Sequence, residues 1–375
     1  MNVQELISEY EKEAQAYLAE HPESTISFGL SVEGERTVRY LRSADAEQVA
    51  MPDASSIYEI GSVSKIFTTS LFAVLEARGV LALEDPIGKH LPSHLNISPE
   101  VAAVTLRQLM THTAGFVNTG KRHQEIQDSE GRGTEPPWGF YTHYLRYKKE
   151  HLYSDLETAE FVYPPDEGYL YSVLGMGTLG HILELATGTP YLQLLDENIC
   201  KPLGLTDIAY DLNPEQLERM VFAYDKLGQP CPNWYHDVML PQGGLRGTVA
   251  DLLTFAEANI KASREPDDDS ELAAALRRAR EVHWKAPDGY KLEGTDHAMP
   301  FDCGLAWMAF RTADPQRFNW YHGGTTLFYN AGLGAQPESG VGFAVLNSSR
   351  TGVVDAAQLF PMVLSWYFRT VAAQS

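Results

Sequence analysis

Ser62 and Lys65 lie three positions apart in the stretch Ser62-Val63-Ser64-Lys65, and they could act as a nucleophile and its base. On a helix, residues at i and i+3 share a face, so the Lys65 ammonium would lie near the Ser62 hydroxyl. A helix N-terminus and partial burial both lower the pKa of a lysine, and a neutral lysine can accept the serine proton. The pair therefore predicts the Ser-Lys form of nucleophilic catalysis.

The same residues also have a purely structural interpretation, because roughly one S-x-x-K is expected by chance in a chain of this length. In that interpretation Ser62 is a helix N-cap and Lys65 is solvated. The hydrophobic residues that follow, among them Ile66, Phe67 and Leu71, instead predict a buried helix. An unused lysine on a buried helix costs free energy, so the pattern favours a functional Lys65.

Two later segments carry residues that could complete such a site. Tyr171 stands in the glycine-bounded stretch GYLYSVLGMG, followed by Ser172, which could assist it or only pack. His322-Gly323-Gly324-Thr325 follows the strand-like run RFNWY, and its two glycines would let a substrate lie close to the strand edge. The backbone amides of Thr325 and Ser62 together could form an oxyanion hole.

The order S-x-x-K, Y-S-x, H-G-G resembles that of the penicillin-recognising serine hydrolases. This group contains class C β-lactamases, D,D-carboxypeptidases, D-aminopeptidases and β-lactamase-like carboxylesterases, and S-x-x-K is one of its signatures. The linking stretches VTLRQLMTHTAGF, YLQLLDENICKPLGLTD and GGLRGTVADLLTFAEANI are similar as well. The resemblance runs from about Ser24 to Ser349, which is most of the chain.

The resemblance implies a role for each matching position. Ser62 would be the acylated nucleophile and Lys65 its activating partner. Tyr171 would be the general base or proton relay that works with Lys65 in acylation and then activates the deacylating water. A tyrosine with a pKa of about 10 needs a neighbouring cation for this role, and Lys65 would be that cation.

Two positions depart from the pattern of the family. Val173 replaces the asparagine of Y-x-N, whose side chain would hydrogen-bond the substrate amide and the active-site lysine, and valine can do neither. His322 stands where β-lactamases carry a lysine, and histidine is only partly charged near neutral pH. Both changes weaken the case for penicillins or peptidoglycan stems and favour esters, or amides with an apolar acyl group. The aromatic segment that holds Trp138 and Tyr141 is expected to line the pocket.

These observations predict a serine hydrolase that forms an acyl-enzyme on Ser62 and acts on a small ester or amide. A D-amino-acid peptidase or amidase is an alternative, suggested by His322. An acyltransferase would use the same acyl-enzyme with another acceptor. A non-catalytic binding or sensor protein on the same fold is the alternative from a different class, and Val173 is its main hint. Val173 makes a true β-lactamase the less favoured interpretation.

The composition of the chain disfavours some classes of binding partner. With 29 Lys and Arg against 50 Asp and Glu, the 375-residue chain has a net charge of −21, which disfavours nucleic acid and anionic lipid. No apolar run reaches the ~18 residues that span a bilayer. The N-terminus has no secretory pattern, and three sparse cysteines fit a reducing compartment, so we expect a cytoplasmic protein.

No metal or cofactor is implied, and GFVNTGKR lacks the Ser/Thr of a phosphate loop because Arg122 replaces it. The oligomeric state stays open.

Several elements must position these residues. A polar N-terminal helix precedes a hairpin formed by TISFGLSV and RTVRYLRS, and the C-terminal third gives four strand-like runs in an antiparallel meander. A last helix, VVDAAQLFPMVLSWYFRTVA, contains Pro361, which predicts a kink. The segment from Val117 to Tyr153 lacks clean periodicity and is interpreted as a loop. His112 and His181 are interpreted as structural residues.

The order of these elements predicts an α+β fold of the β-lactamase/D,D-peptidase type. Its antiparallel sheet would come from the N- and C-terminal segments and be flanked by helices. Residues 1–84 and 205–375 would form a discontinuous sheet domain, and residues 85–204 an inserted, mostly helical domain. The active site would lie between the two.

Overall fold

The computed structural model describes residues 3–44, 46, 49–130, 142–224, 229–292, 296, 298–349 and 352–374. Its main feature is a seven-stranded antiparallel sheet in the order β2-β1-β9-β8-β7-β6-β5. The strands are β1 (Thr25–Val32), β2 (Glu35–Arg42), β5 (Phe301–Cys303), β6 (Met308–Arg311), β7 (Phe318–Thr325), β8 (Tyr329–Gln336) and β9 (Val341–Ser348). Because β1 pairs with β9 along its whole length, the N- and C-terminal segments form one sheet, and this prediction is confirmed.

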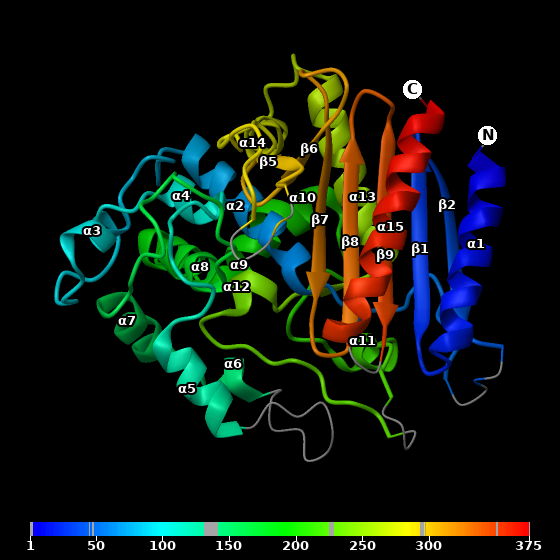
Figure 1. The fold of residues 1–375 in the computed structure, drawn as a ribbon, viewed down its shortest axis with the longest axis horizontal. Coiled ribbons are helices and arrows are strands. Elements are labelled where there is room, and N and C mark those ends of the chain that lie inside the picture. Colours follow the sequence, from blue (N-terminus) through cyan, green and yellow to red (C-terminus); the bar gives the residue numbers. More distant parts are fainter. Residues whose placement is uncertain are drawn as a thin grey trace.

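Both faces of the sheet are covered by helices. Along β9, Phe343 and Val345 point into the core beneath α1 (Val3–Glu20) and α15 (Gly352–Gln374), while Ala344 points into the larger core on the other face. This alternation is the side-chain period of a strand. Figure 1 shows α1 and α15 lying together over one face of the sheet. The predicted helix-flanked α+β architecture is therefore confirmed.

The first and last helices hold each other through aromatic packing. Tyr10 of α1 stacks on Trp366 of α15 with ring centroids 5.2 Å apart, and Trp366 also packs on Phe28 of β1. The indole N–H of Trp366 donates a hydrogen bond to Glu13. Pro361 lies inside α15, and the kink stays a prediction.

The other face of the sheet packs against a group of helices that carries the middle of the chain. They include α2 (Ser64–Ala77), α4 (Leu106–Met110), α8 (Val173–Thr187), α9 (Tyr191–Leu195), α12 (Leu240–Gly243), α13 (Val249–Arg264) and α14 (Glu271–Ala279). Thr248 caps α13 by accepting a hydrogen bond from the Asp251 amide. His181 is buried in α8 and bonds the Tyr153 hydroxyl, which agrees with its predicted structural role.

The prediction of a loop from Val117 to Tyr153 is wrong for the described part of that segment. It contains α5 (Lys121–Glu130), α6 (His143–Arg146) and the start of α7 (Lys149–Glu157). The buried Asp155 carboxylate on α7 accepts hydrogen bonds from the Arg122 and His123 amides at the start of α5 and from the Tyr147 hydroxyl. Because this cap comes from more than 30 residues away, no local pattern could reveal it.

The largest core continues across the predicted domain boundaries. It joins Leu75 of α2, Leu109 of α4 and Leu179 of α8 to Leu253 of α13 and Leu333 of β8. The division at residues 84/85 and 204/205 therefore stays a prediction. Among the helices of the described ranges, none combines the length and the apolar character that crossing a bilayer requires.

Candidate active site

Ser62 lies in a one-turn 3-10 helix, Gly61–Val63, directly before α2. Gly61 has φ +50°, and a Cβ there would lie 2.8 Å from the Thr325 amide nitrogen. A Cβ at Gly324 would lie 2.1 Å from the Ile60 carbonyl oxygen. Both glycines are therefore needed so that the end of β7 can approach the turn that carries Ser62. Gly324 makes room for the protein's own backbone, whereas the sequence suggested room for a substrate.

The Lys65 side chain is fully buried and lies behind Ser62. Its Nζ is 2.9 Å from Ser62 Oγ, 2.5 Å from the Gln242 carbonyl oxygen and 3.1 Å from Gln242 Oε1. Burial lowers the pKa of Lys65 well below its usual value, because desolvation disfavours the ammonium form. This arrangement favours a neutral amine beside the serine hydroxyl, the state in which lysine can act as a base.

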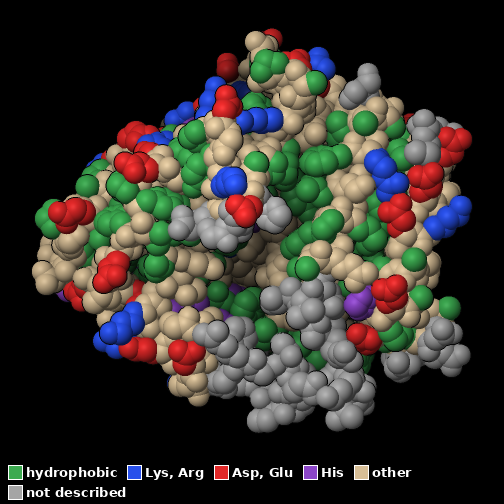
Figure 2. All heavy atoms as spheres, in the orientation of Figure 1, with side chains coloured by type: hydrophobic (Ala, Val, Ile, Leu, Met, Phe, Trp, Pro, Cys, Tyr) green, Lys and Arg blue, Asp and Glu red, His purple; other side chains and the backbone are tan. Residues whose placement is uncertain are grey.

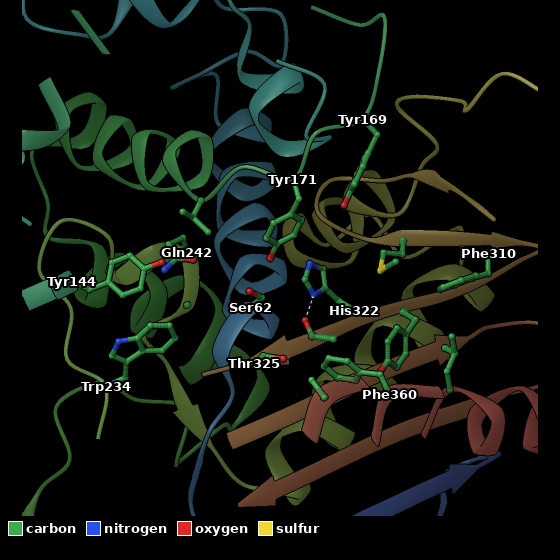
Figure 3. Close-up of a pocket in the computed structure, with 17 residues that line it drawn as sticks. Ser62, Tyr144, Tyr169, Tyr171, Trp234, Gln242, Phe310, His322, Thr325 and Phe360 are labelled. Atoms are coloured by element: carbon green, nitrogen blue, oxygen red, sulfur yellow. Dashed lines mark hydrogen bonds between the residues drawn. The ribbon is translucent and has the colours of Figure 1, made fainter. Parts of the chain in front are cut away.

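Tyr171 lies above the same pair. Lys65 Nζ is 4.9 Å from the centroid of its ring, and Figure 3 shows the Tyr171 hydroxyl directed toward Ser62. Burial raises the pKa of Tyr171, and a hydrogen bond with the Ser62 side chain opposes that rise only in part. The phenol therefore stays protonated at neutral pH. This differs from the expectation of a tyrosine base activated by a lysine cation, because burial disfavours both the phenolate and the ammonium.

His112 and Ser172 position the Tyr171 segment. The Ser172 amide donates a hydrogen bond to His112 Nδ1, and the rings of His112 and Tyr171 lie 4.4 Å apart. The Ser172 hydroxyl donates to the Val117 carbonyl and accepts from the Gly175 amide, which makes Ser172 the N-cap of α8. These contacts agree with the structural interpretation of His112 and make Ser172 a packing and capping residue.

His322 lies on β7 on the other side of Tyr171. Its Nδ1 is 2.6 Å from the Gly323 carbonyl oxygen, and since a carbonyl can only accept, Nδ1 carries the hydrogen. Burial, with a further contribution from Lys65, lowers the pKa of His322 to about 3. The imidazole is thus neutral at physiological pH, not partly charged as its type alone suggests. Its Nε2 is a hydrogen-bond acceptor, and Figure 3 shows this nitrogen on the side of Tyr171.

The Thr325 amide is oriented toward the turn of Ser62. Just beyond the end of β7, the Thr326 amide donates to the Tyr329 carbonyl of β8. The neighbouring pair, Thr325 and Asn330, is therefore a non-hydrogen-bonded pair of the ladder. The N–H of Thr325 therefore points away from β8. The segments that carry the Thr325 and Ser62 amides are in van der Waals contact, which is the arrangement that an oxyanion hole needs.

These residues surround one cavity of about 600 Å³. Figure 2 shows the surface hollowed between the helical half and the sheet half, with hydrophobic side chains around the hollow. Ser62, Tyr171, Val173, His322, Gly323 and Thr325 all line the cavity. Most of its other walls are aromatic or aliphatic: Tyr144, Tyr169, Trp234, Met308, Phe310, Tyr321, Ala356, Phe360 and Leu364. Among the described residues that line it, none is Lys, Arg, Asp or Glu.

The predicted aromatic wall has a mixed outcome. Trp138 and Tyr141 lie outside the described residues. Tyr144, from the same segment, lines the cavity, whereas Tyr147 is buried away from it and donates its hydroxyl hydrogen to Asp155.

Sequence reasoning missed several lining residues. Met308 and Phe310 alternate along the predicted strand β6, and Phe360 and Leu364 are four residues apart on α15, so periodicity could have placed each pair on one face. Gln242 gave no such signal, because only the tertiary structure brings it to Lys65.

Four of the six histidines that are buried in the described part of the chain are expected to make the fold sensitive to acid. Burial lowers the pKa of His123 and His322 to about 3 and the pKa of His112 and His236 well below the usual value of 6.5. Below pH 6.5 the unfolded chain binds protons at these sites and the folded chain does not, so the free energy of unfolding falls as pH drops toward 3. Each histidine should cost about 1.4 kcal/mol per pH unit.

Urea unfolding at pH 7.5 and 5.5 checks this expectation. His123→Phe removes one of these four histidines from an aromatic cluster. The difference in the free energy of unfolding between the two pH values should therefore be smaller in this variant by the contribution of one histidine. Equal free energies of unfolding at the two pH values would contradict it.

Comparison with known proteins agrees with this geometry. The family model described as Beta-lactamase matches residues 11–364. A D-alanyl-D-alanine-carboxypeptidase/endopeptidase, AmpH, from Escherichia coli K12 is 28% identical over 207 residues, or 55% of this chain and 49% of that protein. A β-lactamase from Psychrobacter immobilis is 24% identical, covering 80% of this chain and 66% of its own. This chain thus spans about half the length of the first relative.

Solved structures share the fold over nearly the whole chain. A β-lactamase/D-alanine carboxypeptidase from Pseudomonas syringae superposes with a TM-score of 0.74 at 17% identity, covering 96% of this chain and 98% of that one. A class C β-lactamase from Rhodobacter sphaeroides gives a TM-score of 0.73 at 19% identity, with coverages of 98% and 99%. Together with the family match over residues 11–364, the fold and the arrangement of Ser62, Lys65 and Tyr171 lead to one conclusion: this chain belongs to the Beta-lactamase family.

Proposed function

We propose that the protein is a serine hydrolase that cleaves small neutral esters with an apolar acyl group, through an acyl-enzyme on Ser62. One observation carries this proposal. The described residues around Ser62 form a largely aromatic cavity without a charged side chain, and Lys65 is buried behind the serine. Such a cavity stabilises an uncharged, apolar substrate and leaves a carboxylate without a partner.

The reaction follows from the positions of three side chains. Neutral Lys65 takes the Ser62 proton as Ser62 Oγ attacks the ester carbonyl, and the Thr325 and Ser62 amides stabilise the oxyanion. Tyr171 passes the proton to the leaving alcohol, so the C–O bond breaks and an acyl-enzyme remains. Water attacks that ester, the proton returns to Ser62, and the carboxylic acid is released.

His322 disfavours substrates that carry a carboxylate near the leaving group. In the cavity, His322 presents a neutral ring whose Nε2 accepts hydrogen bonds but donates none. A carboxylate oxygen beside Nε2 would therefore face a lone pair and not an N–H group. We therefore expect His322→Lys to raise kcat/KM for a carboxylate-bearing ester relative to a neutral one by about tenfold or more.

A matched pair of substrates tests both statements. 3-(Methoxycarbonyl)phenyl butyrate and 3-carboxyphenyl butyrate differ in one methyl group and one negative charge on the leaving phenol. Wild type should prefer the neutral ester by about 10²-fold, and His322→Lys should narrow the gap. Equal rates for the two esters in wild type would contradict the proposal, as would an unchanged ratio in the variant.

The similarity to a D-alanyl-D-alanine-carboxypeptidase/endopeptidase favours a peptidase as the second candidate. Peptides ending in D-Ala-D-Ala belong in the same assay, and their cleavage at a rate above that of both butyrates would favour this alternative. Faster product formation with added alcohols would indicate acyl transfer. Absence of a covalent adduct with every substrate would favour the binding or sensor protein.

A further inference from the structure

We propose that Gln242 supplies the side-chain amide that Val173 withholds, and that it orients Lys65 as the base for Ser62. This inference rests on the proposed serine hydrolase function and names a positioning residue for it. Gln242 lies on α12, about 70 residues from Val173, and both residues line the same cavity. Val173 offers no donor or acceptor there, so the lysine depends on another element for its partners.

Two oxygens of Gln242 face the amine of Lys65. Nζ lies 2.5 Å from the backbone carbonyl oxygen and 3.1 Å from the side-chain Oε1. A neutral amine has two N–H bonds and one lone pair. When the two oxygens of Gln242 accept the two N–H bonds, the lone pair is directed to the third neighbour, Ser62 Oγ, at 2.9 Å.

Tyr144 fixes which end of the amide faces the lysine. Burial raises the pKa of Tyr144, and a hydrogen bond with the Gln242 side chain opposes that rise, as an amide N–H directed at the phenol oxygen would. Figure 3 shows the Tyr144 hydroxyl beside the end of the Gln242 side chain. With the amide nitrogen on Tyr144, Oε1 is left for Lys65.

This arrangement gives Gln242 an effect on the pKa of Lys65 that packing alone would not have. Oε1 is an acceptor that stabilises the ammonium form, so removing it lowers the pKa of the lysine. A carboxylate at the same place stabilises the ammonium more strongly and raises the pKa. Gln242→Ala and Gln242→Glu should therefore shift the titration of Lys65 in opposite directions.

The rate of labelling by an alkyl fluorophosphonate reports this titration without requiring ester recognition. Ser62 Oγ forms a bond to phosphorus, the P–F bond breaks, the serine proton goes to Lys65 and fluoride leaves. In Gln242→Ala the rate should fall by about 10–100-fold, because the lone pair is no longer held on Ser62. The acid limb of its pH profile should move to lower pH in Gln242→Ala and to higher pH in Gln242→Glu.

A second-site variant tests whether Gln242 replaces the missing asparagine. Val173→Asn in the Gln242→Ala background should recover about tenfold of the lost labelling rate, because it returns an amide to the same cavity. Gln193→Ala is the matched control, since Gln193 is an exposed glutamine whose side-chain amide donates to Glu197. Thermal unfolding of each variant shows whether it is folded.

The outcomes separate this inference from the proposed function. Opposite shifts of the acid limb with recovery in the double variant support it. Three results would overturn it. They are an acid limb at the wild-type pH in both Gln242 variants, a labelling rate of Gln242→Ala within twofold of wild type, and no recovery of the labelling rate when Val173→Asn is added. If wild type is labelled by the fluorophosphonate but cleaves no ester, the proposed function is wrong. The labelling rates of the Gln242 variants then still test whether Gln242 orients Lys65.

Discussion

Replacing Ser62 with alanine is expected to abolish covalent labelling and to lower ester hydrolysis by at least about 10⁴-fold. The hydroxyl of Ser62 is the proposed nucleophile and lies 2.9 Å from a buried lysine amine, and alanine leaves the rest of the cavity in place. Intact-protein mass spectrometry after incubation with 3-(methoxycarbonyl)phenyl butyrate should show a butyryl adduct on wild type and none on Ser62→Ala.

Ser70→Ala is the matched control for this experiment. Ser70 lies on the same helix, α2, and its buried hydroxyl has no hydrogen-bond partner among the described residues. Its removal should leave labelling and turnover unchanged. Hydrolysis that survives in Ser62→Ala at the wild-type rate would mean that another group carries the reaction.

Replacing Lys65 with methionine is expected to lower acylation by about 10³-fold, because it removes the proposed base but keeps the buried volume of the side chain. Tyr171→Phe should depend on the leaving group. A p-nitrophenyl ester releases a stable anion that needs no proton, so loss of the phenol should cost less than about tenfold. With an ethyl ester, whose alkoxide must be protonated, the loss should reach about 10²-fold.

The comparison distinguishes the two assignments of the base. If Tyr171→Phe is as inactive as Lys65→Met on the p-nitrophenyl ester, tyrosine is the base, as the family resemblance implies. If only Lys65→Met is inactive there, the buried lysine is the base, as the low pKa of Lys65 and the high pKa of Tyr171 indicate. Lys261→Met, at an exposed lysine on α13, controls for the substitution itself.

The sequence predicts much of the site, because the candidate reactive residues lie in short local motifs. Ser62 and Lys65 are one helical turn apart, and His322 to Thr325 end a strand whose glycines allow a close backbone approach. Their order along the chain led to the family, and the hairpin and meander predicted a sheet that joins the two ends of the chain. These features depend on periods of two and 3.6 residues, which neighbouring residues determine.

The tertiary structure decided the protonation states and the partners. Burial, which a sequence does not report, makes His322 neutral and disfavours both the Lys65 ammonium and the Tyr171 phenolate. The amide that faces Lys65 comes from Gln242, on a different helix from Val173. From the sequence alone, Val173 indicated a preference for esters and, as an alternative, a binding protein, but no replacement for the missing asparagine. Desolvation and contacts between distant segments arise only when the chain is packed, and for that reason the sequence gives the reacting groups but not their charges or their supports.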